Sequence, residues 1–489
     1  MHFPSHHNKK GFLLISTIVY AGIGMLFVTV FIGWAGISLK ASRVLSAREQ
    51  AMQIAEAGID YYRWHLAHAQ NDFKDGTNVS GPYVHAFKDK NGVTIGSFSL
   101  TITPPITGST LVTIQSKGTV LADTHLARTV KTQLAIPSFA KYAVVANADM
   151  RFGQGTEIFG QVHSNGGIRF DGIAHNIVSS AKTSYDDPDH TGANEFGVHT
   201  HVNAPPSSGI NDAFRPLEAP PATVPARTDV FIADRQFPVP QVDFAGITND
   251  LSNMKSNAQA SGKYLAPSGA LGYHIIFKVN DTFDVYKVTN MQSAPNGCTN
   301  SQSQTGWGTW SIRANNGQTF VANYPNPTNG IIFAEDDVWV DGQINTARVT
   351  VAAGKFPDNV NTRKSITVNS DLKYTNYDGQ DVLALVAQNN INTGMASATT
   401  LRIDAALIAQ NGRAGRYYYG SSCSPYNTRT SITLYGMIGT NQRYGFAYTD
   451  GTGYATRNIN YDANLLYGPP PSFPLTSDKY TTILWQEVK

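Results

Sequence analysis

The chain has 489 residues, and only 15% of them are Asp, Glu, Lys or Arg, well below the about 25% of an ordinary soluble domain. Glycine (43), tyrosine (23) and phenylalanine (23) are abundant, which favours short strands and turns over helical bundles. A net charge of +2 argues against a nucleic-acid binder with a dense basic surface, and two cysteines exclude a cysteine-rich zinc or iron–sulfur protein.

The first predicted element is a long membrane helix. After a polar leader, residues 11–39 carry no charge, a run long enough to span a bilayer with some tilt. Residues 40–69 continue without proline, and small or apolar residues recur there at spacings of three and four. The sequence therefore predicts one helix over residues 12–70, membrane-spanning to about residue 39 and amphipathic beyond it.

Two short motifs resemble those of type IV prepilins. The run Lys-Lys-Gly-Phe-Leu-Leu-Ile at residues 9–15 is similar to a prepilin processing site, and residues 53–59 are similar to the Ala-Glu-Ala-Gly segment of PilX-like minor pilins. The resemblance covers residues 9–136. It implies that a prepilin peptidase removes residues 1–11 as a leader and that the new N-terminus is methylated. The processing residues would be Lys10, Gly11 and Phe12. The alternative is a plain single-span anchor that is never cut.

The fifth position of the implied mature chain departs from the major-pilin pattern. Major pilins carry glutamate there, whereas counting from Phe12 places Ser16 at that position. In pilins this glutamate compensates the N-terminal amine of a neighbouring subunit inside the apolar filament core, where an unpaired charge is costly. Some minor pilins and pseudopilins at the filament tip also lack it, so the resemblance implies a minor subunit and not the repeating one.

Residues 71–136 are expected to form a small antiparallel β head. Three runs alternate β-branched or aromatic residues with polar ones, and prolines and a glycine separate them. The runs are Ile95–Thr103, Leu111–Leu121 and His125–Ile136. Packed on the polar half of the long helix, they would make a pilin-like head.

A repeat in the remainder predicts a β-solenoid. Five short apolar strands recur at a nearly constant spacing, and a fixed period of about 17–18 residues per rung is typical of stacked coils. The strands start at Ile331, Val349, Ile366, Leu383 and Leu401. First rungs are expected over residues 137–204 and the main solenoid over residues 331–460. An antiparallel sandwich with chance spacing is the alternative.

Two insertions and a tail interrupt or follow the predicted solenoid. Residues 205–330 carry eight prolines between positions 205 and 240 and then a predicted hairpin of Tyr273–Val279 with Thr282–Val288. Residues 411–431 form the second insertion, and residues 461–489 are a C-terminal tail expected to cover the open edge of the solenoid. Each insertion contains one cysteine, Cys298 or Cys423, and outside the cytoplasm this pair is expected to be a disulfide.

Aromatic residues of the insertions lie outside the core periods. They are Trp307, Trp310, Tyr417, Tyr418 and Tyr419. Exposed aromatics in loops suit glycan stacking or protein contact, so a surface role is predicted for them. Packing of the insertions onto the solenoid is the equal alternative.

Histidines gather in the first solenoid rungs. They are His163, His175, His190, His199 and His201. His199 and His201 alternate, so both would face one side of a strand and could bind a metal with Asp186, Asp187 or Asp189. Because the sequence has no HExxH motif and no compact Cys/His spacing, surface histidines are expected here, with no metal and no cofactor.

Solenoids also host enzymes that cleave polysaccharides, which need converging carboxylates. The candidates are Glu335, Asp336, Asp337, Asp341 and Asp404. Acidic residues next to a strand are routine, so no catalytic residue and no enzymatic activity are predicted.

The expected function is that of a non-enzymatic minor pilin-like subunit of a type IV pilus or related filament. It would lie at the tip or initiate assembly, and display the solenoid for adhesion or protein contact. Expected partners are other pilin subunits, the pilus assembly machinery, a prepilin peptidase, membrane lipid, and a surface glycan or protein, but no nucleic acid. The expected location is the cell membrane, single-pass, with an extracytoplasmic C-terminal part. The alternative is a membrane-anchored carbohydrate-binding or carbohydrate-active β-helix protein.

Overall fold

A computed structural model describes the backbone of residues 9–244, 246–475 and 479–488, and the side chains of these residues apart from 9–12 and 246–249. The chain forms two compact units. Unit 1 comprises Met1–Pro104, Val112–Leu134 and Tyr480–Lys489. Unit 2 comprises Pro105–Leu111 and Ala135–Lys479. Residues 1–8 of the predicted leader lie outside the described residues.

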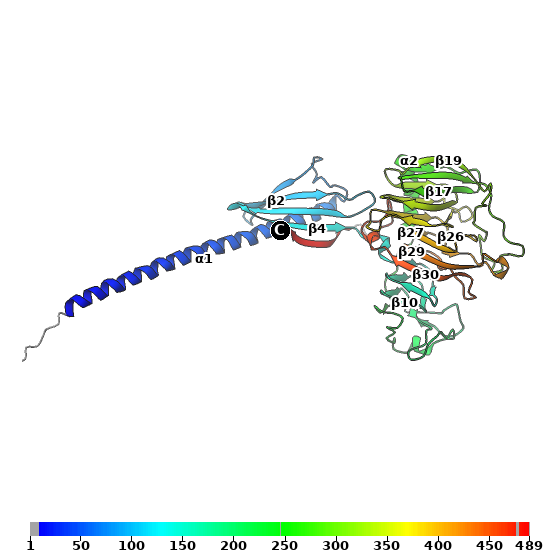
Figure 1. The fold of residues 1–489 in the computed structure, drawn as a ribbon, viewed down its shortest axis with the longest axis horizontal. Coiled ribbons are helices and arrows are strands. Elements are labelled where there is room, and N and C mark those ends of the chain that lie inside the picture. Colours follow the sequence, from blue (N-terminus) through cyan, green and yellow to red (C-terminus); the bar gives the residue numbers. More distant parts are fainter. Residues whose placement is uncertain (1–8, 245, 476–478, 489) are drawn as a thin grey trace, which may run out of the picture. The chain divides into compact units, whose positions relative to one another are not determined.

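Unit 1 begins with one uninterrupted helix, α1 (Lys9–His68), of 60 residues. In Figure 1 it runs as a single blue helix whose C-terminal part lies against the strands of unit 1. The absence of proline lets the helix continue from its apolar half into its amphipathic half. The prediction of one long N-terminal helix is confirmed.

The head of unit 1 is a five-stranded sheet in the order β1-β2-β3-β4-β31. Its strands are β1 (Tyr83–Lys88), β2 (Thr94–Thr103), β3 (Val112–Val120), β4 (Asp123–Ala135) and β31 (Thr481–Val488). β1 to β4 pair antiparallel in chain order. The three predicted head strands correspond to β2, β3 and β4, whereas β1 and β31 were not predicted. The end of the C-terminal tail is thus a strand of the head sheet, beside β4, and does not cover the solenoid edge.

The buried stripe of α1 packs on this sheet. Ala51, Ile54, Ala55, Tyr62 and Leu66 are fully buried. They share one core with apolar side chains of β2, β3 and β4. Because these helix residues recur every three or four positions, one face is covered and the other stays polar.

Unit 2 consists mainly of short strands with one long helix. The strands are β5 (Val144–Ala146), β6 (Met150–Phe152), β7 (Thr156–Ile158), β8 (Val162–Ser164), β9 (Ile168–Phe170), β10 (Ile173–Ala174), β11 (Val178–Ser180), β12 (Ser184–Tyr185), β13 (Glu195–Phe196), β14 (Val198–His199), β15 (Arg235–Gln236), β16 (Lys263–Leu265), β17 (Gly272–Lys278), β18 (Thr282–Val288), β19 (Gln318–Pro325), β20 (Ile331–Ala334), β21 (Val338–Ile344), β22 (Arg348–Ala353), β23 (Ile366–Thr367), β24 (Leu372–Tyr374), β25 (Val382–Ala387), β26 (Ile391–Thr393), β27 (Thr400–Ala409), β28 (Ala414–Arg416), β29 (Thr428–Thr440) and β30 (Gly453–Tyr461). The helix is α2 (Gly246–Ser261). Short 3-10 turns occur at Phe139–Lys141, Pro216–Glu218, Ser421–Cys423 and Ala463–Leu466.

Most strands of unit 2 pair in parallel with strands of the next coil. One ladder runs β16-β20-β22-β25-β27-β29-β5-β8-β11-β15. A second runs β17-β21-β23-β26-β28, and a third runs β21-β24-β27-β29-β30-β7-β10. This is the coil-on-coil pairing of a solenoid. The predicted mainly β fold with a long N-terminal helix is confirmed.

The length of a coil differs from the prediction. Val144 pairs with Val162, which is one step of the predicted repeat further along the chain. Val349, however, pairs with Leu383, which is two such steps further along. Ile366, which lies between those two, pairs instead with Val338 on a different face of the coil. A uniform short rung is therefore wrong for residues 331–460: β20 and β22, one step apart, pair with each other, whereas the next apolar strand, at Ile366, belongs to a different ladder.

The coils do not stack in the order of the sequence. Near the C-terminus, β29 pairs with β5 and β30 pairs with β7. In the stack, the coils formed early in the sequence therefore lie next to the coils formed last. In Figure 1 the labels β17, β27, β29, β30 and β10 follow one another along unit 2. Helix α2 lies between β15 and β16 along the chain, and these two strands belong to opposite ends of the first ladder.

Residues 205–330 contain more regular structure than was predicted. The predicted hairpin is confirmed as β17 with β18, and β19 extends it by antiparallel pairing with β18. β17 also pairs with β21, so the hairpin belongs to the stack. Helix α2 was not predicted, and its Leu251 and Met254 are buried against Phe333 and Ile331.

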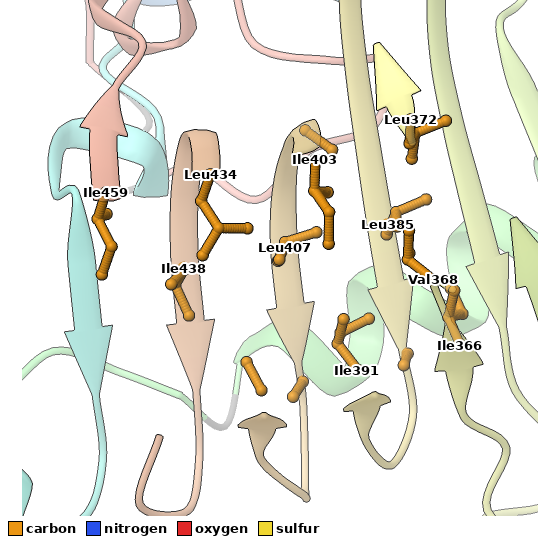
Figure 2. Close-up of a cluster of buried hydrophobic side chains, with 14 of the residues drawn as sticks. Ile366, Val368, Leu372, Leu385, Ile391, Ile403, Leu407, Leu434, Ile438 and Ile459 are labelled. Carbon is orange, nitrogen blue, oxygen red and sulfur yellow. The ribbon is translucent and has the colours of Figure 1, made fainter. Parts of the chain in front are cut away.

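The inward side chains of successive coils form one continuous core. Figure 2 shows Leu385, Leu407 and Ile438 projecting from neighbouring strands into the same interior. These side chains are fully buried. Stacking of branched aliphatic side chains at every coil removes them from water, which drives formation of the stack.

We expect Ile438→Val to lower the free energy of unfolding by about 0.5–1.5 kcal/mol, because it deletes one buried methylene group. The measurement is urea unfolding of the full-length chain in detergent. The matched control is Ile232→Val at a side chain that is 51% exposed, and it should change the midpoint little. Equal losses in both variants would contradict the burial of Ile438.

Candidate functional site

The N-terminal half of α1 exposes apolar side chains all around the helix. From Leu13 to Leu39 the large hydrophobic side chains are 43% to 73% exposed. Among the described residues, α1 is the helix long and apolar enough to cross a membrane. A helix that is hydrophobic on every side needs lipid or other helices around it. This half of α1 is therefore a candidate membrane anchor.

The implied processing site lies at the start of this helix. The backbone of Lys10, Gly11 and Phe12 is helical, and their side chains lie outside the described residues. Ser16 donates a hydrogen bond from its hydroxyl to the carbonyl of Leu13, at 3.0 Å. Ser16 thus satisfies its own polar group within the helix and brings no charge into the apolar surface.

The C-terminal half of α1 approaches the sheet through small residues. A Cβ atom added at Gly118 of β3 would lie 2.1 Å from the carbonyl oxygen of Ala51 and 2.5 Å from the amide nitrogen of Ala55. One added at Gly58 would lie 2.3 Å from Oγ of Ser116. Gly58 is the glycine of the Ala-Glu-Ala-Gly segment, so this motif has a structural role here. It allows the helix backbone to lie close to the sheet.

The predicted cysteine pair, Cys298 and Cys423, forms a disulfide in the structure. Tyr417 and Tyr419 are buried beside it, together with Met395. The surface role predicted for these two tyrosines is therefore wrong. They belong to the inner packing that holds the two insertions together.

The other predicted surface aromatics are partly buried at the same place. Trp307 donates its indole N–H to the carbonyl of Tyr418 at 2.9 Å, and Trp310 donates to the carbonyl of Gly306 at 3.0 Å. Tyr418 donates from its hydroxyl to Asp450 at 2.6 Å. Because these polar groups are paired within the chain, the aromatics pack the insertions onto the coils, the alternative that the sequence left open.

A buried arginine completes this packing. Arg416 donates to the carbonyl oxygens of Met395 (2.9 Å) and Tyr426 (2.6 Å). Its guanidinium also lies 4.7 Å from the ring centroid of Tyr419. Burial lowers the pKa of Arg416 to about 10. The carbonyl groups and the aromatic ring compensate the buried cation in place of a carboxylate.

The acidic residues considered for catalysis each have partners of their own. Glu335 accepts from Tyr264 at 2.5 Å, Asp341 pairs with His274 at 2.9 Å, and Asp404 accepts from Tyr377 at 2.6 Å. Asp336 and Asp337 share Lys364, at 3.0 and 3.6 Å. These contacts hold strands and turns of separate coils, and they give no pair of carboxylates a common partner across coils.

Three of the five histidines come together in the structure. His190, His199 and His201 form a cluster with Asp187 and Glu195, in which all potential ligand atoms lie within 4.8 Å of one another. The side chains of these five residues, the histidine cluster, are at most 5% exposed. The expectation that these histidines lie at the surface is therefore wrong for the three in the cluster, and also for His163, which is buried.

The three imidazoles of the histidine cluster point at the same two carboxylate oxygens. The Nε2 atoms lie 2.9, 2.8 and 3.1 Å from Oε2 of Glu195, in the order His190, His199, His201. They lie 3.6, 3.5 and 3.9 Å from Oδ2 of Asp187 in the same order. Among the described residues, Nε2 of His199 and Oδ2 of Asp187 are buried without a hydrogen-bond partner.

Outer contacts orient the members of the histidine cluster. Oε1 of Glu195 accepts from the backbone N–H of Arg215 at 2.8 Å, and Oδ1 of Asp187 accepts from that of Asp189 at 3.0 Å. Nδ1 of His201 faces the carbonyl oxygen of Asn211 at 2.8 Å. Each carboxylate therefore has one oxygen held by the backbone and directs the other at the histidines.

The electrostatic environment keeps both carboxylates of the cluster ionised. Burial raises the pKa of Asp187, but the facing His199 outweighs it and the pKa is lowered to about 2. Burial also raises the pKa of Glu195, and the facing imidazoles hold it well below its usual range. Burial lowers the pKa of His199, and the two carboxylates more than compensate and raise it.

The remaining histidines and aspartates lie elsewhere. His163 contacts Ser179 and Asn165 at 3.0 and 3.1 Å, and His175 pairs with Glu157 at 2.7 Å. Of the three aspartates considered, only Asp187 joins the cluster. The sequence analysis did not include Glu195 among the candidate ligands. Its position four residues before His199 could have indicated that the two side chains lie close together.

Comparison with known proteins leaves the family of this chain open. Neither the family models nor the curated proteins contain a match. Among solved structures the chain is similar to the competence-associated pilin ComZ from Thermus thermophilus, with 13% identity over 90% of this chain and 97% of that chain. The TM-score is 0.31, so the likeness establishes neither a shared fold nor a shared function.

Proposed function

We propose that this chain is a pilin-like minor subunit of a type IV pilus or related filament. The observation that carries the proposal is the division of α1 into two halves. The first half exposes apolar side chains on every side, and the second half buries one stripe against an antiparallel sheet. Such a helix can be held by lipid before assembly and by the helices of other pilins afterwards.

The fifth position supports a role other than that of the repeating subunit. If the mature chain begins at Phe12, Ser16 takes the place of the charge-compensating glutamate. Its hydroxyl bonds to the carbonyl of Leu13 and offers no counter-charge to a neighbouring amine. A subunit of this kind belongs at the tip or at the start of a filament.

The size of unit 2 favours the same position. Pro105–Leu111 and Ala135–Lys479 form a unit much larger than the head sheet. Subunits packed along a shaft would have to accommodate a copy of it at every step, whereas a tip subunit would not. In this proposal unit 2 is a non-enzymatic platform for adhesion or protein contact outside the cytoplasm.

The proposal predicts processing of the N-terminus. In membranes that contain a prepilin peptidase, the mature protein should begin with N-methylated Phe12, and its mass should lack residues 1–11. Substitution of the residue before the cut, Gly11→Leu, should leave the full-length chain uncut. Intact-mass spectrometry and N-terminal peptide sequencing measure both outcomes.

A matched control uses Gly22→Leu, a glycine within the apolar half of the helix where an added Cβ meets nothing within 4 Å. This variant should be processed like the wild type. An intact N-terminus in the wild-type chain would overturn the pilin assignment and leave a simple membrane-anchored protein. If the chain is processed, immunogold labelling of this protein on sheared filaments distinguishes a position at the tip from one along the shaft.

A further inference from the structure

We propose that the histidine cluster of unit 2 is a structural binding site for a divalent transition metal, with Zn²⁺ as the favoured ion. This site is independent of the proposed pilin role. The ligands would be Nε2 of His190, His199 and His201 with Oδ2 of Asp187 and Oε2 of Glu195. These atoms already converge on one volume, because three imidazoles and two carboxylates present ligand atoms within 4.8 Å of one another.

The contacts of His201 direct its Nε2 at the carboxylates of the cluster. Its Nδ1 faces a carbonyl oxygen, which can only accept, so Nδ1 carries the proton. Nε2 faces Oε2 of Glu195, 3.1 Å away, a contact that a proton or a metal ion between the two atoms would bridge. A metal-binding histidine usually donates a hydrogen bond from its other ring N–H to a carbonyl or carboxylate oxygen, which fixes the orientation of the ring.

The charges of the buried site also balance with a divalent ion. Asp187 and Glu195 together carry two negative charges, which one divalent ion would neutralise. The next charged group, Arg169, is fully buried and donates to Asp171 at 2.7 Å. Its Nη1 also lies 3.7 Å from Oδ2 of Asp187.

The donor set selects the class of metal. Three imidazole nitrogens with carboxylate oxygens suit zinc and its first-row neighbours. Calcium and magnesium prefer oxygen ligands alone. The site contains no thiolate, because both cysteines of the chain are in the disulfide, so a soft-metal site of cysteines is not formed here.

Burial favours a structural role for the metal. Catalytic zinc sites usually have three protein ligands and one open position, whereas structural sites are closed. Here five protein side chains converge, and none is more than 5% exposed. The ligands come from the turn after β12, from β13, from β14 and from the residues just beyond it.

The position of these elements shows what the metal would hold. β14 is the outer strand of the three-stranded ladder β14-β9-β6, and within the described part of the chain β12 pairs with β13 alone, as a two-stranded sheet. Strands this short carry few ladder hydrogen bonds. A metal shared by β13, β14 and the turn after β12 would fasten this segment to the coil that contains β9.

The test is metal analysis of the full-length chain purified in detergent without a polyhistidine tag. After treatment with a chelator and reloading with Zn²⁺, the wild type should retain close to one Zn²⁺ per chain through dialysis. His199→Gln and His201→Gln should each reduce this retention at least about tenfold. Each variant removes a side chain that binds the metal directly, and the loss of even a supporting contact weakens metal binding about 10–100-fold. The control His175→Gln, a histidine outside the cluster, should retain the wild-type amount.

Two further readouts keep the proposal falsifiable if a variant fails to fold. Wild-type chain loaded with Co²⁺ should develop visible d–d absorption bands, and Zn²⁺ should displace them. Reloading with Zn²⁺ should raise the melting temperature by at least about 5 °C over the chelated chain, because the ion binds the folded state. Failure to retain Zn²⁺ or Co²⁺, or equal retention in His199→Gln, would overturn the site.

Discussion

Replacing Gly118 by valine is expected to unfold unit 1, with a loss of about 3 kcal/mol or more in the free energy of unfolding. A Cβ at this position would lie 2.1 Å from the carbonyl oxygen of Ala51 and 3.1 Å from Cα of Ala55. These are backbone atoms of α1, which cannot rotate away as a side chain can. The helix would have to move off the sheet, and the core of Ile54, Tyr62 and Leu66 would be exposed.

The matched control is Lys117→Val, which places the same side chain on the same strand. Lys117 is exposed, whereas Ser116 and Gly118 face the helix, because neighbours on a strand point to opposite faces. Limited proteolysis and the thermal unfolding curve of the full-length chain should separate the two variants. Similar resistance in both would show that α1 does not lie as close to β3 as described.

Removing the disulfide is expected to have the second large effect, a loss of about 3–5 kcal/mol in the stability of unit 2. The cysteines are 125 residues apart, so the bond restricts a long segment of the unfolded chain. The double variant Cys298→Ala and Cys423→Ala would also leave the tyrosines beside the bond without packing partners. Urea unfolding of the full-length chain should give a lower midpoint than the wild type.

Reductant provides the control for that comparison. Dithiothreitol should lower the midpoint of the wild type toward that of the double variant, and should not change the double variant. Free-thiol counting by mass spectrometry gives the redox state of each sample. A wild type that contains two free thiols when isolated from the cell envelope would contradict the pairing.

Several elements could be predicted because their signals are local. The run of uncharged residues at 11–39 predicts a helix long enough to span a membrane whatever it packs against, and α1 is helical over this run. Alternating residues predicted β2, β3 and β4. The turn Asn280-Asp281 between two apolar runs predicted the hairpin of β17 and β18. The disulfide could be predicted because the chain has two cysteines, so one pairing is possible.

The missed features depend on contacts between distant residues. The sequence of β31 resembles that of many short strands. Its partner β4 is adjacent to it in the sheet, but almost all of unit 2 lies between the two strands along the chain. Ile366 has the same local pattern as Val349, yet the two lie on different faces of the coil. Parallel ladders match strands through space, so equal spacing along the chain does not report which strands become neighbours.

The histidine cluster shows the same limit at the scale of a site. Alternation placed His199 and His201 together, but His190 and Glu195 join them only because the turn after β12 and strand β13 fold back on β14. A linear motif such as HExxH would have been visible in the sequence, because one helix sets its spacing. A site assembled from a turn and two short strands has no such fixed spacing.

The sequence alone thus determined the long N-terminal helix, the β character of the remainder and the cysteine pair, since hydrophobicity, strand propensity and composition act locally. The tertiary structure decided the order of the coils, the burial of Tyr417 and Tyr419, and the convergence of His190, His199 and His201. Those outcomes depend on which distant segments exclude water together, a choice made by the whole chain when it packs.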